Sequence, residues 1–552
     1  MRAGRAGNGD RMAHGTAARP IAPQTSPLPR AHAGRLCAMP PDLFGHEIPP
    51  ATQPGRRFPL SKSRLVAYKQ CAKRLWLQTF RRELAQQSEA SANRMAQGNL
   101  IGAAAHRLFP GGRLIAHVDD LPAALRATRE ALAQPGDVTL FEPALRCSDI
   151  LVRADVLVRE GGRYRMVEVK ASTKVKDYHV ADAAIQAWVA RGAGLDVTRV
   201  ELAHVDNQFV YPGGGDYRGL FAFADLTDAV VLLQEQIPLW IAAAQRDLAG
   251  PMPDIAVGSQ CSDPFECEFL AFCAPETAEY PVDLLPNGGR LARQLRSEGF
   301  ADLRDVPADR LTRDDHQRIW RVTRNGAAEL DPAAVAKLDA LPWPRYYVDF
   351  ETVGPAVPLW KGTRPYQKIP MQWSCHRQDA DGTLAELPPF LDRTGDDPRR
   401  AFAESLVAAI GDSGALIVYN ASFERTVLLQ LADAFPDLAP ALRDMAQRIF
   451  DLLPFAREHY YHPAMMGSWS IKKVLPTIAP DLDYANLDSV QSGDMVEPAY
   501  FEMIGADTPP ARKQALADAL LTYCARDTLA MVRVAQHLAG PAAPAAAVDS
   551  DG

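Results

Sequence analysis

Several features that define other protein classes are absent from this chain of 552 residues. No apolar run approaches the roughly 18 to 20 residues that a membrane-spanning helix needs, which predicts a soluble protein with no membrane partner. No Gly-x-x-x-x-Gly-Lys-Ser/Thr loop is present, so an ATP-driven motor would have to be a separate partner such as a helicase. Positive charge is not in excess either. The net charge of -7 excludes a histone-like coat protein and still permits a local basic groove.

Cysteine is also scarce, at eight residues. Their uneven spacing, with no evident secretory signal, argues against a disulfide framework and predicts a reducing, cytoplasmic location. Cys261, Cys267 and Cys273 lie close together, and Cys71 stands alone far upstream. Four thiolates suit either a cubane iron-sulfur cluster or structural zinc. The five-residue gaps of the triplet favour the cluster, because zinc knuckles are usually tighter. Cys37, Cys147, Cys375 and Cys524 are expected to be bystanders.

Composition and hydrophobic periodicity predict two α/β domains joined by a helical segment. The segment from Leu60 to Arg107 carries nine Lys or Arg against two acids, so it is locally basic. The predicted parts are a disordered tail (1–58), a first domain (60–275), a helical connector or spacer (276–340), a second domain (345–535) and a second disordered tail (541–552).

The first predicted site lies on a strand hairpin. Leu151-Arg159 and Arg163-Lys170 read as strands joined by Gly161-Gly162, and a helix follows through Ala181-Val189. Alternation places Glu168 and Lys170 on one face of their strand. The hairpin brings Asp155 opposite, with Glu142 upstream. Carboxylates of this kind hold Mg²⁺ or Mn²⁺ for phosphodiester cleavage, and a fixed ammonium stabilises charge at the phosphate.

This order of residues resembles the PD-(D/E)XK nuclease superfamily. Gly102 and His106 are similar to a helical element of its RecB-like branch, and Gln186 is similar to the branch's glutamine motif, although Ala190 replaces a tyrosine common there. Tyr68 to Trp76, around Cys71, resembles the first-cysteine segment of RecB-like iron-sulfur nucleases, including AddB and the CRISPR-associated ones. The resemblance implies a restriction-endonuclease-like fold whose metal ligands are His106, Glu142, Asp155 and Glu168. It also implies catalytic roles for Asp155, Glu168 and Lys170 and contact of Gln186 with nucleic acid. A 4Fe-4S cluster would be bound as a clamp by Cys71, Cys261, Cys267 and Cys273.

A second set of acids lies in the later domain. In the hydrophobic strand Tyr346-Phe350 and the residues after it, Asp349 and Glu351 share one face, which is unfavourable unless a cation lies between them. Glu424 follows the strand Leu416-Tyr419, at the start of a helix. Tyr523 and Asp527 are four residues apart on one helix face.

These three motifs resemble the DEDD exonucleases of the ribonuclease H-like clan, in the tyrosine variant. The resemblance implies that Asp349, Glu351, Glu424 and Asp527 bind two divalent metals and that Tyr523 orients the attacking water. Glu424 departs from the family, which normally has Asp there. Asp451 is better explained as a helix cap than as a further acidic element. As a whole, 345–535 resembles an uncharacterised bacterial domain of this clan that is commonly joined to a RecB-like iron-sulfur nuclease.

Basic and aromatic residues between His462 and Pro476 could contact a nucleic-acid strand by charge and stacking. Lys472, Lys473 and Asn420 are the predicted contacts. The sequence therefore predicts a cytoplasmic metal-dependent nuclease with a 3'-5' exonuclease module, acting on ends of single-stranded DNA, with RNA as the other substrate considered. The alternative is an iron-sulfur nucleic-acid-binding protein in which one or both modules are inactive.

Overall fold

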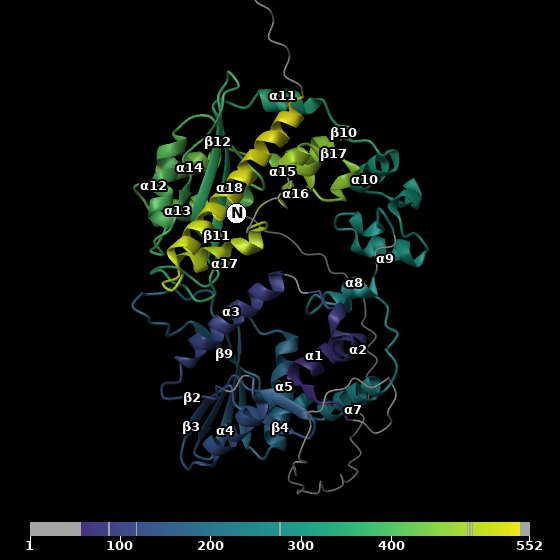
Figure 1. The fold of residues 1–552 in the computed structure, drawn as a ribbon, viewed down its shortest axis with the longest axis vertical. Coiled ribbons are helices and arrows are strands. Elements are labelled where there is room, and N and C mark those ends of the chain that lie inside the picture. Colours follow the sequence, from purple (N-terminus) through teal and green to yellow (C-terminus); the bar gives the residue numbers. More distant parts are fainter. Residues whose placement is uncertain are drawn as a thin grey trace, which may run out of the picture. The chain divides into compact units, whose positions relative to one another are not determined.

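The protein has a mixed α/β architecture in which helices cover two separate six-stranded sheets (Figure 1). The computed structural model describes residues 57–540 except 87–88, 117–118, 275–277, 483, 485–486 and 488–489. The predicted tails therefore lie outside the described residues, apart from Arg57 and Phe58. Phe58 packs on Phe80 and hydrogen bonds to Gln245, so it belongs to the folded part and the predicted tail ended too late. Within the described part, no helix combines the length and apolar character needed to cross a membrane.

The first six-stranded sheet is mixed, in the order β2-β3-β6-β7-β8-β9. β6 and β7 form the predicted hairpin, and Gly161 and Gly162 have the positive φ values, 56° and 83°, that a tight loop uses. β8 lies parallel to β7, and α5 connects them. The strands are β2 (Arg113–Leu114), β3 (Val138–Phe141), β6 (Val156–Glu160), β7 (Arg163–Lys170), β8 (Val197–Val205) and β9 (Phe221–Asp225).

The prediction of one continuous strand over Leu151-Arg159 was wrong. The chain leaves the extended ladder at Ala154 and Asp155, which separate β5 from β6. β5 pairs instead in a three-stranded sheet of order β1-β5-β4, so the break lets the chain change sheets. These strands are β1 (Leu60–Ser61), β4 (Ala144–Cys147) and β5 (Ile150–Arg153).

Helices enclose both faces of the strand that carries the first predicted site. Alternation along β7 places Met166 in a core with Ala184 of α5, and Val167 in another core with Ile101 of α3. Two helices follow β1 and meet at Cys71, whose extended backbone caps both. The helices of this half are α1 (Lys62–Gln70), α2 (Ala72–Phe80), α3 (Glu89–His106), α4 (Leu121–Ala133), α5 (Asp177–Gly192), α6 (Thr227–Leu233), α7 (Gln236–Ala249) and α8 (Leu270–Cys273).

The connector of 276–340 is helical, as predicted, and it packs into the core of the residues that follow it. Leu295, Ile319 and Leu338 share one buried cluster with Tyr461 and Val532. The segment is therefore built into the later domain, unlike a free spacer. Its elements are α9 (Gly289–Ser297), α10 (Asp314–Asn325), β10 (Glu329–Leu330) and α11 (Ala333–Asp339).

The second six-stranded sheet has the order β13-β12-β11-β15-β16, with β14 also paired to β12. β11 lies antiparallel to β12 and parallel to β15. The strands are β11 (Arg345–Val353), β12 (Ile369–Gln378), β13 (Leu384–Glu386), β14 (Phe390–Leu391), β15 (Ala415–Val418) and β16 (Ile449–Asp451), and β17 (Tyr460–Tyr461) pairs with β10.

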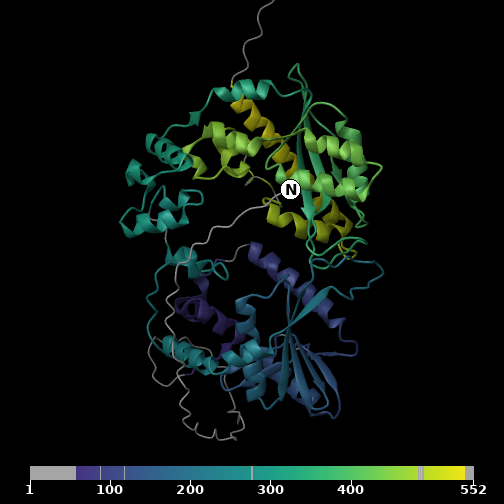
Figure 2. The same ribbon diagram turned by 180° about the vertical axis from the view of Figure 1, so that it is seen from behind.

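Two helical layers sandwich this second sheet. Along β11, Tyr346, Val348 and Phe350 pack toward α12, α13 and α14, and Tyr347 packs with Val532 of α18 on the other face. Figure 2 shows the α12–α14 layer on the side of the sheet away from α18. Asp349 and Glu351 therefore lie on one face of β11, as strand alternation predicted, and this face is the one covered by α18. The helices are α12 (Arg399–Ile410), α13 (Ser422–Ala434), α14 (Ala439–Gln447), α15 (Leu452–His459), α16 (Ile471–Val474), α17 (Gly493–Ile504) and α18 (Pro510–Leu538).

We predict that Gly467→Ala destabilises the fold because it disrupts the contact between the connector and the later domain. Gly467 has a φ of +73°, and an added Cβ would overlap the backbone carbonyl oxygen of Leu284. The left-handed backbone alone costs about 1 kcal/mol or more for a side chain. Thermal unfolding should show a lower Tm.

The matched control is Gly493→Ala, at the first position of α17, where an added Cβ meets nothing within 4 Å. That variant should be neutral or slightly stabilised. Equal Tm values for the two variants would contradict the close approach of Gly467 to Leu284.

Candidate functional site

Glu168 is the centre of the first site. It lies on β7 with only 1% of its surface exposed. Its Oε1 accepts a hydrogen bond from Lys62 Nζ at 2.7 Å and lies 2.8 Å from Lys170 Nζ. Its Oε2 accepts a hydrogen bond from Gln186 of α5. Three separate elements, α1, β7 and α5, therefore hold one carboxylate.

Asp155 approaches the same place from the residue before β6. Its Oδ2 accepts a hydrogen bond from the Val169 backbone N–H at 2.6 Å, across the hairpin. Burial and the neighbouring Glu168 raise the pKa of Asp155 to about 7. Burial also opposes ionisation of Glu168, but Lys170 and Lys62 outweigh it and hold the Glu168 pKa below its ordinary value. The pair thus stays ionised at Glu168 and titrates near neutral pH at Asp155.

Lys170 lies between two acids. Its Nζ is 2.8 Å from Asp182 Oδ2 of α5 as well as 2.8 Å from Glu168. Burial disfavours the charged ammonium, yet Glu168 and Asp182 together raise its pKa. Lys170 is therefore a fixed cation beside the two carboxylates, as the sequence predicted.

Two members of this site, Lys62 and Asp182, were missed by the sequence interpretation. Lys62 was identified only as one of the charges in a basic segment. Its local sequence pattern does not show which of these lysines has a side chain that reaches the site. Asp182 lies on the same helix as Gln186, one turn earlier, and that i, i+4 spacing could have indicated a shared face.

Gln186 differs from its predicted role in nucleic-acid contact. It is fully buried and its amide donates to Glu168. None of its side chain is exposed for contact with a nucleic-acid strand. Gln186 instead orients the carboxylate, and its buried Oε1 has no hydrogen-bond partner among the described residues.

The other two predicted metal ligands make different contacts. The His106 ring stacks on Phe141 with 4.1 Å between ring centroids, and burial lowers its pKa. Glu142, which has a φ of 54°, lies 3.7 Å from Arg153 in an ion pair. Burial raises the pKa of Glu142, and Glu168 adds to the rise, so Glu142 is within electrostatic reach of the site.

All four predicted cysteines come together. Cys71, Cys261, Cys267 and Cys273 line a single pocket, and each is a free thiol. Cys71 stands at the junction of α1 and α2, and Cys273 is the last residue of α8. Burial raises the pKa values of Cys267 and Cys273.

Polar contacts join the two chain segments that line this cysteine pocket. Gln70 donates to the backbone oxygens of Gln260 and Phe265 at 2.7 and 2.6 Å. Arg74 forms an ion pair with Glu268 at 2.8 Å. The start of the module is thereby joined to the cysteine triplet near its end. Thiolates are suitable ligands for an iron-sulfur cluster and for a zinc ion, so the four cysteines around this pocket could hold either one.

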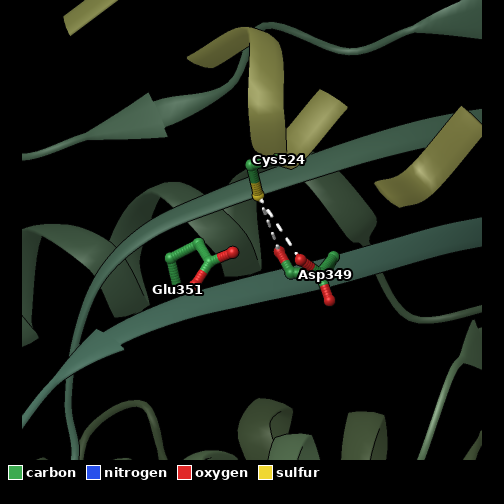
Figure 3. Close-up of side chains that lie close together, drawn as sticks. All are labelled: Asp349, Glu351 and Cys524. Atoms are coloured by element: carbon green, nitrogen blue, oxygen red, sulfur yellow. Dashed lines mark hydrogen bonds between the residues drawn. The ribbon is translucent and has the colours of Figure 1, made fainter. Parts of the chain in front are cut away.

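The second site is built between β11 and α18. Asp349 and Glu351 project from the strand toward Cys524 on the helix, as Figure 3 shows. One ligand atom of each of these three residues lies within 4.8 Å of the other two. Cys524 Sγ is 3.7 Å from both Asp349 Oδ2 and the Asp349 backbone oxygen. Cys524, expected to be a bystander, is part of the site.

Asp527 lies one turn further along α18. The Tyr484 hydroxyl donates a hydrogen bond to Asp527 Oδ1, and Tyr523 also hydrogen bonds to Asp527. Lys472 Nζ lies 5.0 Å from the Tyr484 ring centroid and 5.1 Å from that of Tyr523. Tyr484 was not predicted, because no spacing rule connects it with α18.

Glu424 is the fourth acid, in the first turn of α13. Only 2% of its surface is exposed, and its Oε2 has no hydrogen-bond partner among the residues that the structure describes. A buried carboxyl oxygen without a partner is costly, and in a native protein it calls for an explanation such as a bound ion.

Burial and mutual repulsion control the protonation of these four acids. Burial raises the pKa of Asp349 well above its ordinary value, and the neighbouring Asp527, Glu351 and Glu424 add to the rise. The pKa values of Glu351 and Glu424 rise to about 8 and that of Asp527 to about 6. Lys472 works in the opposite direction on Glu351 and Asp527. This one ammonium thus offsets two of the four carboxyl groups, and the four ionise fully only when further positive charge enters.

The remaining predicted residues of this part of the chain are exposed or cap a helix. Asn420 and Lys473 are exposed. Asp451 caps α15 and accepts hydrogen bonds from the backbone N–H groups of Asn420 and Ala421 at 3.0 Å. The prediction of a helix cap at Asp451 is confirmed.

A family model for a domain of unknown function, DUF2779, matches residues 346–470. The match includes Asp349, Glu351 and Glu424 and ends before Tyr523 and Asp527. No curated protein matches the chain.

We predict that the metal-free protein loses stability as pH rises from about 5 to 8, and that Glu424→Gln reduces this loss. The folded state holds a proton on Glu424 up to about pH 8, whereas the unfolded chain releases it near the ordinary value of 4.5. Between these values the folded state binds more protons, so its stability falls with rising pH. At pH 9 the variant should have a Tm higher than wild type by a few degrees.

The control is Glu404→Gln on α12, whose side chain is about half exposed. It should follow the wild-type curve. Glu424→Gln running parallel to wild type across this pH range would show that the carboxyl group is not buried as described.

Proposed function

We propose that this protein is a metal-dependent nuclease that hydrolyses phosphodiester bonds at the ends of nucleic acid, with single-stranded DNA favoured over RNA. The observation that carries the proposal is the convergence of four carboxyl groups beside a tyrosine, those of the buried Glu424 and of the partly buried Asp349, Glu351 and Asp527. Such an arrangement costs free energy unless divalent cations neutralise it. Two-metal phosphodiester cleavage is the chemistry that needs it.

The later domain would act as a DEDD-type 3'-5' exonuclease of the ribonuclease H-like clan. Bound Mg²⁺ or Mn²⁺ would supply an activated water and neutralise charge on the phosphate. Asp349, Glu351, Glu424 and Asp527 would hold the ions, and Tyr523 would orient the water. Lys472, beside both tyrosines, would attract the phosphate, and the exposed Lys473 and Asn420 lie where a strand could contact them.

Glu424 fits this assignment despite the longer side chain. Its Oε2 is buried and has no hydrogen-bond partner in the described structure, so one oxygen is available to an ion. The extra methylene places that oxygen further from α13 than an aspartate would. The match of 346–470 to a domain of unknown function leaves this activity open to experiment.

The earlier domain would be a PD-(D/E)XK nuclease of the RecB-like branch. The antiparallel hairpin β6–β7, the parallel β8 and the helix α5 support this assignment, because they bring Asp155, Glu168 and Lys170 together. Asp155 and Glu168 would hold the metal, and Lys170 would stabilise charge at the phosphate. Glu142 and His106 would have to move from Arg153 and Phe141 to join them.

The four cysteines would hold a 4Fe-4S cluster that clamps the two ends of this module. The pocket that they line, between the α1–α2 junction and the triplet, supports this role. Thiolates at these four positions are the required ligands.

A second function is favoured by the state of Glu168. Both of its oxygens are engaged, by Lys62, Lys170 and Gln186. A carboxylate that is already neutralised has less need of a metal ion. The earlier module could therefore bind nucleic acid without cleaving it, and the later module would then perform the hydrolysis alone.

We predict that Lys170→Ala and Asp349→Ala each abolish a different product of single-stranded DNA cleavage. Anaerobically purified protein would be incubated with Mn²⁺ and DNA labelled at either end, with RNA in parallel. Loss of one essential charge should lower the corresponding activity at least about 100-fold. Lys174→Ala and Asp381→Ala, both at exposed positions, are the matched controls and should keep wild-type rates.

The outcomes separate the two functions. If only Asp349→Ala reduces cleavage, the earlier module is a binding module. If wild-type protein cleaves neither DNA nor RNA, the nuclease proposal is wrong. The alternative, an iron-sulfur protein that binds nucleic acid without cleaving it, is then favoured.

We predict that Cys267→Ser removes the iron and lowers the stability of the earlier module. The measurements are metal content of the purified protein and its visible absorbance. Cys147→Ala, which alters a buried cysteine on β4 away from the pocket, should keep its iron. Stoichiometric zinc in place of iron in wild-type protein would overturn the cluster assignment.

A further inference from the structure

Cys524 introduces a sulfur ligand into an acidic site that otherwise offers oxygen. Its Sγ lies 3.7 Å from Asp349 Oδ2, and a ligand atom of Glu351 lies within 4.8 Å of both residues. Figure 3 shows the thiol pointing from α18 toward the two carboxylates on β11. The thiol is fully buried, so its immediate surroundings are these groups and not solvent.

The spacing suits one particular class of metal ion. Zinc binds sulfur at about 2.3 Å and carboxylate oxygen at about 2.1 Å, which gives a sulfur-to-oxygen edge of about 3.6 Å in a tetrahedron. The observed 3.7 Å is close to that edge. Mg²⁺ takes oxygen ligands in a near-ideal octahedron and has little affinity for a thiol.

A second observation points to a ligand here. Glu424 Oε2 is buried with no hydrogen-bond partner in the described part of the chain, and its charge acts on both Asp349 and Glu351. This orphaned oxygen lies outside the 4.8 Å group of Asp349, Glu351 and Cys524, but it is within electrostatic reach of both carboxylates. Two carboxylates and one thiol supply three ligands of a tetrahedral zinc-like ion and leave its fourth position open.

We propose that Asp349, Glu351 and Cys524 form a binding site for a thiophilic divalent cation of the zinc class. Coordination replaces the S–H bond of Cys524 with a metal–sulfur bond and releases the proton to solvent. Because affinity follows the order in which zinc exceeds manganese, a trace of Zn²⁺ competes with Mn²⁺ for Asp349 and Glu351. Zinc would thereby inhibit hydrolysis at this site. The inhibition of hydrolysis by zinc rests on the proposed nuclease function, whereas the binding of the cation does not.

Cobalt(II) tests the binding directly, because a cobalt–thiolate bond gives a near-ultraviolet charge-transfer absorption. The full chain, purified anaerobically with its four-cysteine pocket filled, would be titrated with Co²⁺. Wild type should gain this absorption with one equivalent. Cys524→Ser should lack it and bind Co²⁺ at least about tenfold more weakly, an effect as large as that of losing an outer-shell partner.

The matched control is Cys375→Ala, since Cys375 is equally buried and lies on β12 of the same sheet. It should keep the absorption. Glu351→Gln leaves the thiol in place and should weaken Co²⁺ binding, so it tests the site even if the serine variant folds poorly. No absorption in wild type, or equal absorption in Cys524→Ser, would overturn the site.

An activity assay then separates this inference from the proposed function. Zn²⁺ added to a Mn²⁺-supported reaction should inhibit wild type and inhibit Cys524→Ser at least about tenfold less. Cobalt absorption without any cleavage would refute the nuclease proposal and leave the metal site standing. Cleavage without cobalt absorption would refute the metal site alone.

Discussion

The repulsion between buried carboxylates is the constraint around which both sites are organised. In the earlier domain the protein balances it internally, because Lys62 and Lys170 both contact Glu168. In the later domain burial raises the pKa values of four acids, and Lys472 offsets this rise for Glu351 and Asp527 alone. The first site is therefore near charge balance without an ion, whereas the second keeps protons until positive charge arrives. The same problem has two solutions in one chain.

Strand alternation explains why so much of the second site could be predicted. The face of β11 that carries Asp349 and Glu351 was fixed by the apolar residues between them, and Tyr523 and Asp527 follow from helical spacing. What could not be predicted comes from contacts between distant segments. Tyr484 reaches Asp527 from the segment between α16 and α17, and Cys524 was indistinguishable from the other buried thiols because only its contact with β11 sets it apart.

In the first domain too, features set by the local sequence were predictable, and features set by contacts between distant segments were not. The hairpin and its glycines were predictable, and so was the shared face of Glu168 and Lys170. The break at Ala154 and Asp155 was not, because the apolar pattern runs through it while the chain moves from one sheet to another. The burial of Gln186 was missed for a related reason, since its helix is covered on the sheet side by contacts that no single segment encodes.

Glu168 also connects the beginning of the module with its end. Its partners come from α1, β7 and α5, and α1 is joined through Gln70 to the cysteine triplet some 190 positions later. The strand β1, directly before α1, also pairs with β5, so Lys62 is held from both ends of its helix and Glu168 keeps two ammonium partners.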